Sequence, residues 1–433
     1  MTARNLLLFG GVACLYLITG YLQSWGLALT ILNAALLATI AALGVNIQWG
    51  YAGLFSVGTM GFTALGGLSM VLISARPNTD NWQAGGPGIL LALVLGALSI
   101  MAAIFAWRML APGRLRTLVV GAVMIGGFVL FRMVFDPNVV ATEAVNPQNA
   151  GNIGGLGLPS LAAWPVGGLL AAAAAWAIGK TALGLRSDYL AIATLGIAEI
   201  IVSLMKNEDW LARGVKNLTE LPRPWPVPYE VVLQQEPGYL DFVTRWGLDP
   251  VRTSTLIVDL LYLALFVTVL GVIIWACERA LNSPWGRMMR AIRDNEVSAA
   301  AMGKDVTGRH LQVFILGSAV IGFAGAMMTS MDGQLTPGTY NPLAFTFMVW
   351  VMVIVGGSGN NWGTVLGGLL IGYLWLVVEN IGPNIMEFVT APFPDGAMKE
   401  HLRGSAQHMR LLTMGVILLL VMRFSPRGLI PEK

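Results

Sequence analysis

Long apolar runs follow one another along almost the whole 433-residue chain, separated by shorter polar segments. Twelve such runs lie near residues 5–22, 26–48, 52–75, 88–107, 117–135, 161–179, 189–205, 255–277, 311–331, 342–356, 362–378 and 408–423. A membrane-crossing helix needs about 20 mostly apolar residues. Charged residues make up only 11% of the chain, too few to cover a water-facing surface. We therefore predict an all-α, polytopic integral membrane protein with ten to twelve transmembrane or re-entrant helices, forming a single domain over residues 1–433.

The runs at 52–75, 342–356 and 362–378 are short or interrupted by glycine, so we expect some of them to enter the membrane without crossing it. The first run is preceded by one positive charge and lacks an Ala-x-Ala cleavage site, which favours a retained span over a signal peptide.

Lysine and arginine are concentrated in the segment 279–310 and in the last residues of the chain. Short basic segments stay in the cytoplasm, and an even number of runs separates these two. We therefore expect both termini to be cytoplasmic and two long loops, about 206–254 and 383–407, to be periplasmic. The sequence LPRPWPVP at 221–228 predicts a rigid, extended stretch, with a docking role and a connector role both open.

Several kinds of chemistry lack their usual residues. A net charge of +3 is too small for nucleic-acid binding through an overall basic field. Cys14 and Cys277 lie inside apolar runs, and the three histidines lack metal-ligand spacing, so we expect no metal site. Gly179-Lys180-Thr181 resembles the end of a phosphate loop, but Ala174 occupies the place of the leading glycine. We therefore expect no catalytic residue and no ATP hydrolysis by this chain alone.

The segment from Ser283 to Gly303 predicts a helix outside the hydrocarbon. Ser283 and Pro284 form a helix-start signal, and Gly303 forms a stop signal, so we expect one continuous helix of about twenty residues over 284–303. Along it, Met289, Ile292, Glu296, Ala299 and Gly303 step by three or four and form one stripe, next to Arg287, Arg290 and Asp294. A partner-docking helix and an amphipathic helix on the membrane surface both fit this pattern.

This segment also carries a family resemblance. Its pattern E-x-x-A-A-x-x-G, with Glu296, Ala299, Ala300 and Gly303, resembles the cytoplasmic loop through which permease subunits of bacterial ABC importers insert a coupling helix into their ATPase. Stretches at 42–68, 184–201, 348–372 and 425–431 resemble, more narrowly, the larger permease of branched-chain amino acid importers. The resemblance implies that Arg287, Arg290, Arg293, Asp294, Glu296, Ala299, Ala300 and Gly303 couple the chain to an ATPase.

Two glycine-rich interruptions, one in each half of the chain, indicate a substrate path. Unwound backbone in paired broken helices can replace the hydration of a polar solute, although close helix packing also uses glycine. Glu199 lies inside an apolar run. An ionisable residue within a membrane span indicates a functional role, and for Glu199 we expect a structural or gating role. The predicted path residues are Gly50, Tyr51, Gly53, Ser56, Gly58, Asp188, Thr194, Glu199, Gly356, Gly357, Ser358 and Gly359.

The resemblance implies a permease subunit of a bacterial inner-membrane importer for branched-chain or related amino acids. Its implied partners are a second homologous permease, two ATPase subunits that carry ATP and magnesium, a periplasmic solute-binding protein and the lipid bilayer; no cofactor in this chain and no nucleic acid is expected. A permease for urea or short-chain amides and an ion-coupled secondary transporter remain alternatives. The chain departs from the family in two apolar runs between 75 and 161 and in the sequence after Asn207.

Overall fold

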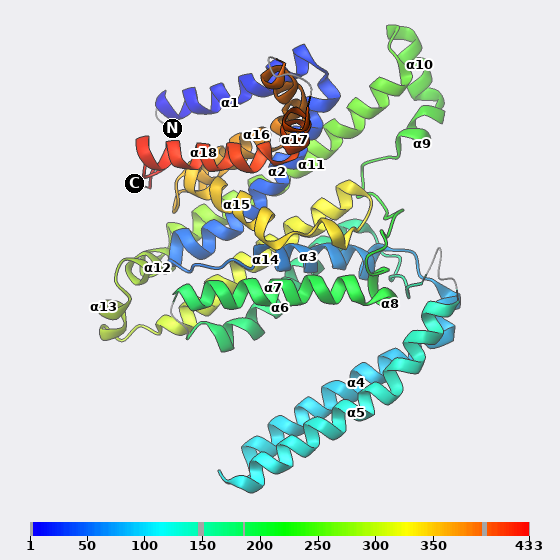
Figure 1. Cartoon of the computed structure of the whole chain (residues 1–433), viewed down its shortest axis with the longest axis vertical. Coiled ribbons are helices and arrows are strands. Elements are labelled where there is room, and N and C mark those ends of the chain that lie inside the picture. The colour runs from blue at the N-terminus through cyan, green and yellow to red at the C-terminus, as the bar shows by residue number, and fades with distance from the viewer. Residues whose placement is uncertain (1–2, 146–150, 185–186, 392–395, 433) are drawn as a thin grey trace.

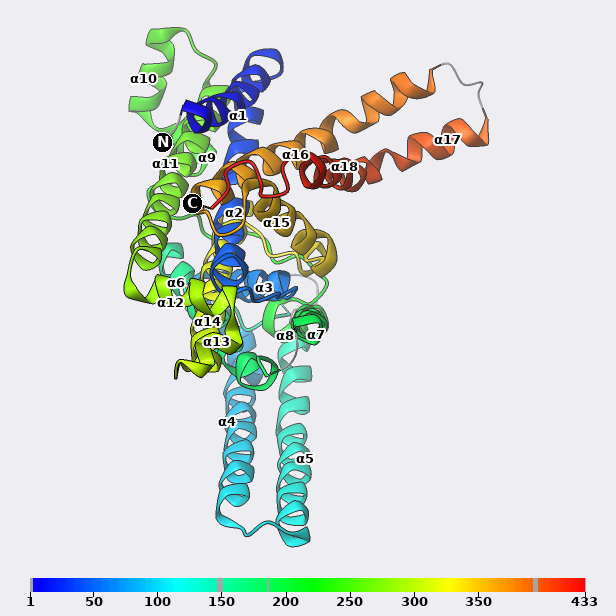
Figure 2. The same ribbon diagram turned by 90° about the vertical axis from the view of Figure 1, so that its left-hand side faces the viewer.

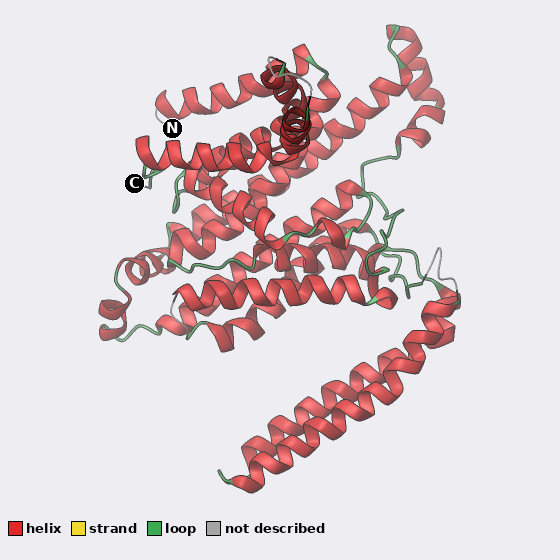
Figure 3. Cartoon of the chain, viewed as in Figure 1, coloured by secondary structure: helices red, strands yellow, loops and turns green. Residues whose placement is uncertain are grey.

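A computed structural model describes residues 3–145, 151–184, 187–391 and 396–432, and these residues form helices and loops without a β-strand (Figure 3). The longer helices are α1 (Ala3–Leu22), α2 (Trp25–Val45), α3 (Thr59–Ser69), α4 (Thr79–Met109), α5 (Arg114–Ala144), α6 (Ser160–Ala182), α7 (Ser187–Asn207), α11 (Pro250–Leu281), α14 (Val306–Asp332), α15 (Pro342–Gly356), α16 (Asn361–Thr390) and α18 (Met409–Phe424). The shorter ones are α8 (Asp209–Ala212), α9 (Glu230–Gln235), α10 (Pro237–Trp246), α12 (Pro284–Asp294), α13 (Glu296–Ala301) and α17 (Ala397–Gly404).

Each predicted apolar run corresponds to a helix. Among the described residues, nine helices are long and apolar enough to cross a membrane, or up to ten if the bent pair α17 and α18 counts as one span. Two shorter apolar helices, Thr59–Ser74 and Leu343–Gly356, cover two of the three runs expected to be short or interrupted by glycine. The all-α polytopic class is therefore confirmed.

Helices extend into both predicted long loops, since α11 begins at Pro250, inside the predicted loop 206–254. The run at 362–378 was expected to be short, but α16 has 30 residues and continues past Pro383 into the predicted loop 383–407. Apolar residues such as Phe388 and Val389 prolong the run, and a membrane helix tolerates a proline. Residues 392–395 of that predicted loop lie outside the described part of the chain.

The other predicted loop, 206–254, contains the short helices α8, α9 and α10. Its stretch 221–228 is non-helical, as predicted, and is fixed to the body: the Ser160 hydroxyl donates to the Pro222 carbonyl over 2.5 Å, and the Leu221 amide donates to the Gly333 carbonyl over 3.0 Å.

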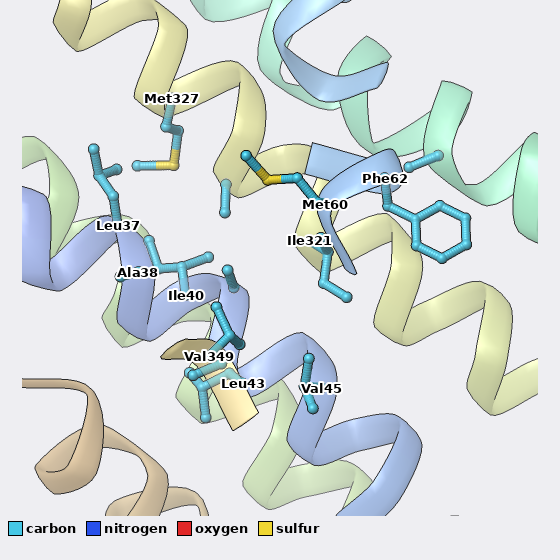
Figure 4. Close-up of a cluster of buried hydrophobic side chains, with 14 of the residues drawn as sticks. Leu37, Ala38, Ile40, Leu43, Val45, Met60, Phe62, Ile321, Met327 and Val349 are labelled. Carbon is cyan, nitrogen blue, oxygen red and sulfur yellow. The ribbon is translucent and has the colours of Figure 1, made fainter. Parts of the chain in front are cut away.

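Helix α14 lies at the centre of the bundle and packs against α2, α3 and α6. These helices approach through glycines: a Cβ added at Gly317 would lie 2.6 Å from the Gly44 carbonyl oxygen, and one added at Gly322 would lie 2.6 Å from the Gly167 carbonyl oxygen. Lipid is as apolar as leucine, so close packing rather than the hydrophobic effect holds such helices together. Figure 4 shows the adjoining buried cluster, where Leu43, Ile321 and neighbouring side chains from several helices meet.

Helices α4 and α5, each of 31 residues, form an antiparallel hairpin that projects from the bundle (Figures 1 and 2). The hairpin is joined to the body near its base, where Ile89, Ala92 and Phe135 pack with Ile153 and Trp210. Both termini lie at the same end of the bundle as α12 and α13 (Figure 1).

Candidate functional site

The two glycine-rich interruptions lie next to each other in the fold. Helix α2 runs into a π-helical turn, Asn46–Gly50, while α15 ends at Gly356 and α16 begins at Asn361. A Cβ added at Gly50 would lie 2.6 Å from the Gly359 amide nitrogen, so the backbones of the two breaks are in contact. The second break turns at Gly359, whose φ of 81° favours glycine.

A buried chain of polar groups links the two breaks. Asn46 Oδ1 accepts the Gly359 amide over 2.9 Å, and Asn46 Nδ2 donates to Asn361 Oδ1 over 3.2 Å. The Tyr51 hydroxyl donates to the same Asn361 oxygen, and Asn361 Nδ2 donates over 3.0 Å to a carboxylate oxygen of Glu278 on α11. Asn46 and Asn361 are both 1% exposed or less, so each amide depends on these partners.

Arg293, at the end of α12, attaches the predicted coupling segment to this place. One of its guanidinium nitrogens, Nη1, donates to the Gly50 carbonyl over 2.5 Å and lies 2.7 Å from a carboxylate oxygen of Glu432. Hydrogen bonds that involve charged groups are stronger than neutral ones. The first break is therefore tied to the coupling segment by a charged side chain.

The C-terminal residues complete the assembly. The Leu429 amide donates to the Val355 carbonyl, and the Ile430 amide donates to the Gly356 carbonyl, each over 2.9 Å. Because Glu432 also pairs with Arg293, this tail joins the coupling segment to the second break. We call the set Asn46, Gly50, Arg293, Gly359, Asn361 and Glu432 the joint.

The unwound residues 53–58 are held between α7 and α15. The Val57 amide donates to Thr194 Oγ1 over 3.0 Å, and the Trp350 indole nitrogen donates to the Ser56 carbonyl over 3.2 Å. A Cβ added at Gly58 would lie 2.8 Å from the Thr194 carbonyl oxygen. In the described part of the chain, the buried Ser56 hydroxyl has no hydrogen-bond partner.

Glu199 lies on the outward face of α7. Along that face Tyr189 is 61% exposed and Ile192 is 68% exposed, a Cβ added at Gly196 would meet nothing within 4 Å, and Glu199 is exposed. Asp188, at the start of the span Asp188–Asn207, is also exposed. An ionisable group on a spanning helix is costly against lipid, by about 2.5–3.5 kcal/mol or more at the helix centre. This stripe of α7 therefore requires water or another protein surface against it.

The coupling segment differs from the predicted single helix. It consists of α12 and α13, separated at Asn295, whose backbone is extended with a φ of −155°. The Asn295 side chain accepts the Ser298 amide over 2.9 Å and so caps a new helix. Asparagine competes with the helical backbone in this way and favours helix starts over interiors.

The predicted stripe faces two directions. Met289, Ile292 and Ala299 are buried against the body. The exposed members of the predicted coupling set are Arg287, Asp294, Glu296, Ala300 and Gly303, whereas Arg290 and Arg293 are half-buried. Val297 and Met302, which the sequence analysis passed over, are each 80% exposed.

The predicted path residues therefore fall into three places. Gly50, Tyr51, Gly356, Gly357, Ser358 and Gly359 gather at or beside the joint; Gly53, Ser56, Gly58 and Thr194 belong to the unwound segment and its contact with α7; and Asp188 and Glu199 lie on the outer face of α7. Sequence reasoning missed Asn46, Glu278, Asn361 and Glu432. The available signal was a polar side chain at the end of an apolar run, repeated in both halves of the chain.

Comparisons with known proteins give one family. A family model described as branched-chain amino acid transport system / permease component matches residues 119–422. The chain is 29% identical over 270 residues to the high-affinity branched-chain amino acid transport system permease protein LivM of Escherichia coli (strain K12), which covers 62% of this chain and 56% of that protein. It is 27% identical over 299 residues to the probable branched-chain amino acid transport permease protein LivM of Methanocaldococcus jannaschii. This match covers 68% of this chain and 74% of that protein. The chain thus spans little more than half the length of the Escherichia coli relative, and no solved structure matches it.

Proposed function

The chain belongs to the family of branched-chain amino acid transport permease components, and from this premise we propose that it is a permease subunit of an ATP-driven importer for branched-chain or related amino acids. Its proposed partners are a second homologous permease, two ATPase subunits and a periplasmic solute-binding protein, with ATP and magnesium on the ATPases. The proposed place is the bacterial inner membrane, with both termini and the coupling segment in the cytoplasm.

The observation that carries the proposal is Arg293. It binds the first break through the Gly50 carbonyl and, through Glu432 and the tail, the second break. A movement of α12 would therefore reach both interrupted helices at once. A two-state transporter needs such a rigid connection between its energy source and its path.

The proposed ATPase contact is the exposed side of α13. Val297 on α13 and Met302, directly after the end of α13, are exposed apolar side chains, whereas Ala299 packs against the body. We propose that these exposed apolar side chains, on a segment placed outside the lipid, contact the ATPase. Because Ala299 is buried against the body, we propose that it positions α13 and leaves the contact with the ATPase to the exposed residues.

The proposed path runs along the outer stripe of α7, with the second permease on its far side. That arrangement would give the Glu199 carboxylate either water or a polar partner in place of lipid. The unwound residues 53–58 contact the opposite, buried face of α7 at Thr194 and so position the helix that carries Glu199.

The test is purification of the complex carrying Met302→Glu in this chain, with Met398→Glu as the matched control. Met398 is 70% exposed on α17, away from the coupling segment, so the control introduces the same charge elsewhere (Figure 2). We expect Met302→Glu to lower ATPase co-purification and leucine-stimulated hydrolysis about tenfold, while the control leaves both unchanged. Equal recovery of ATPase with both variants would contradict the docking role, and uptake that needs an ion gradient but no ATPase would contradict the importer.

A further inference from the structure

A polar cavity of 370 Å³ lies beside the joint, at the end of the bundle that carries both termini. The start of α1, the end of α11, α12, the start of α16 and the C-terminal tail each contribute to its wall. In the described part of the chain, no residue of α7 lines it. The cavity is therefore separate from the proposed path along α7.

Two opposite charges line this cavity without being paired to each other. Within the described residues, the guanidinium of Arg290 makes one long bond of 3.4 Å to the Leu281 carbonyl, and the Glu278 carboxylate accepts one amide hydrogen from Asn361. No ion pair joins Arg290 to Glu278 among the described residues. Glu432 also lines the cavity, but it is paired over 2.7 Å with Arg293, which also contacts the exposed Asp294. The wall thus offers one cation and one anion that remain available.

A ligand with both charges fits this wall better than a ligand with one. A simple cation would leave Arg290 without a counter-charge, and a simple anion would leave Glu278 without one. The amides of Asn5 and Asn282 also line the cavity and can donate or accept hydrogen bonds. A small molecule with an ammonium group and a carboxylate satisfies all of these groups.

The remaining wall is apolar. Leu281, Trp362 and Ile430 line the cavity together with the polar groups. Ligand sites commonly combine apolar walls with a few polar groups that fix orientation, in cavities of about 300–1,000 Å³. This combination selects an amino acid with an apolar side chain over a polar one.

We propose that this cavity binds a zwitterionic amino acid with an apolar side chain from the side of the coupling segment, and that occupancy slows transport. The ligand bridges Arg290 on α12 to Glu278 on α11, and Glu278 in turn holds Asn361 at the second break. Binding therefore fixes the position of α12 relative to the joint, so that accumulated product opposes the movement that imports more. The inhibitory part rests on the proposed function, whereas the binding part does not.

The binding test uses radiolabelled L-leucine and the full chain in lipid nanodiscs. Its competitors are 3-methylbutylamine, which lacks the carboxylate, and 4-methylpentanoate, which lacks the amine. We expect each competitor to bind about tenfold or more weakly than leucine, because each leaves one wall charge without a partner. Asn5→Trp fills the cavity and should abolish binding, whereas Leu6→Trp, at a position that is 61% exposed and lines no part of the cavity, should retain it. Binding that survives Asn5→Trp, or equal binding of leucine and its competitors, overturns the site.

The inhibition test compares uptake by the assembled complex in vesicles that are empty or loaded with leucine. We expect loading to slow uptake in the unaltered chain and in Leu6→Trp, and the ratio of the two rates to approach one in Asn5→Trp. If loading slows Asn5→Trp equally, the inhibitory role fails while the proposed function stands. If no uptake occurs in any chain although nanodisc binding is intact, the proposed function fails while the site stands.

Discussion

Gly50→Ala tests the contact between the two breaks most directly. The added Cβ would lie 2.6 Å from the Gly359 amide nitrogen, whereas ordinary contacts begin at 3.4 Å, and it would also overlap the Asn46 side chain. Overpacking of this kind costs about 1–3 kcal/mol. Displacing Gly359 also breaks its buried bond to Asn46, which costs about 1–3 kcal/mol more. We therefore expect a loss of about 2–6 kcal/mol in the free energy of unfolding.

The assay is unfolding of the purified chain in mild micelles with increasing SDS, followed by the fluorescence of its 14 tryptophans. Gly26→Ala is the matched control, because a Cβ added at Gly26 of the same helix meets nothing within 4 Å. Alanine is a better helix former than glycine, so the control should lie within about 1 kcal/mol of the unaltered chain. If Gly50→Ala and Gly26→Ala unfold at the same SDS fraction, the two breaks are not in contact.

Three further outcomes are expected. Gly66→Ala should destabilise the chain by about 1–3 kcal/mol, because the added Cβ would lie 2.7 Å from a carbonyl carbon of α14. Gly121→Ala, which has open space around it, should not destabilise the chain, and the same SDS titration measures both variants. A double-mutant cycle of Arg293→Gln and Glu432→Gln should give a coupling energy of about 1 kcal/mol, because both side chains are partly exposed. Each single variant should also raise the amount of ATP hydrolysed per solute imported. Additive effects of the two substitutions on stability would show that the ion pair is not formed. Glu199→Gln should leave assembly intact and reduce transport modestly, and loss of the folded complex on gel filtration would refute a gating role.

The sequence predicted the helices well because hydrophobic run length is a local property that the bilayer imposes. It predicted their ends less well. At Pro383 the apolar residues that follow outweigh the proline, while at Asn295 a capping side chain outweighs the helix-forming residues around it. In both cases the position of the helix end depends on how neighbouring residues compete, and a single proline or glycine in the sequence does not decide it.

The joint was only half predictable. The two glycine-rich breaks were visible, but the pairing of Asn46 with Asn361 joins residues 315 positions apart, and no local period encodes such a contact. Arg287, Arg290 and Arg293 were equally good candidates for coupling, because all three lie on one short basic helix. Only the fold separates them: Arg287 is exposed, Arg290 lines the cavity and Arg293 enters the joint.

The order in which the joint residues are synthesised has its own consequence. Leu429, Ile430 and Glu432 are synthesised after every other residue that contributes to the joint. The earlier joint residues are therefore already made before their contacts with the tail can form. Until then Arg293 lacks its pairing with Glu432, and the second break lacks the backbone hydrogen bonds from the tail. A nascent chain can therefore insert the described spans up to α18 and still lack a fixed coupling segment, because the tail that fixes this segment follows them in the sequence.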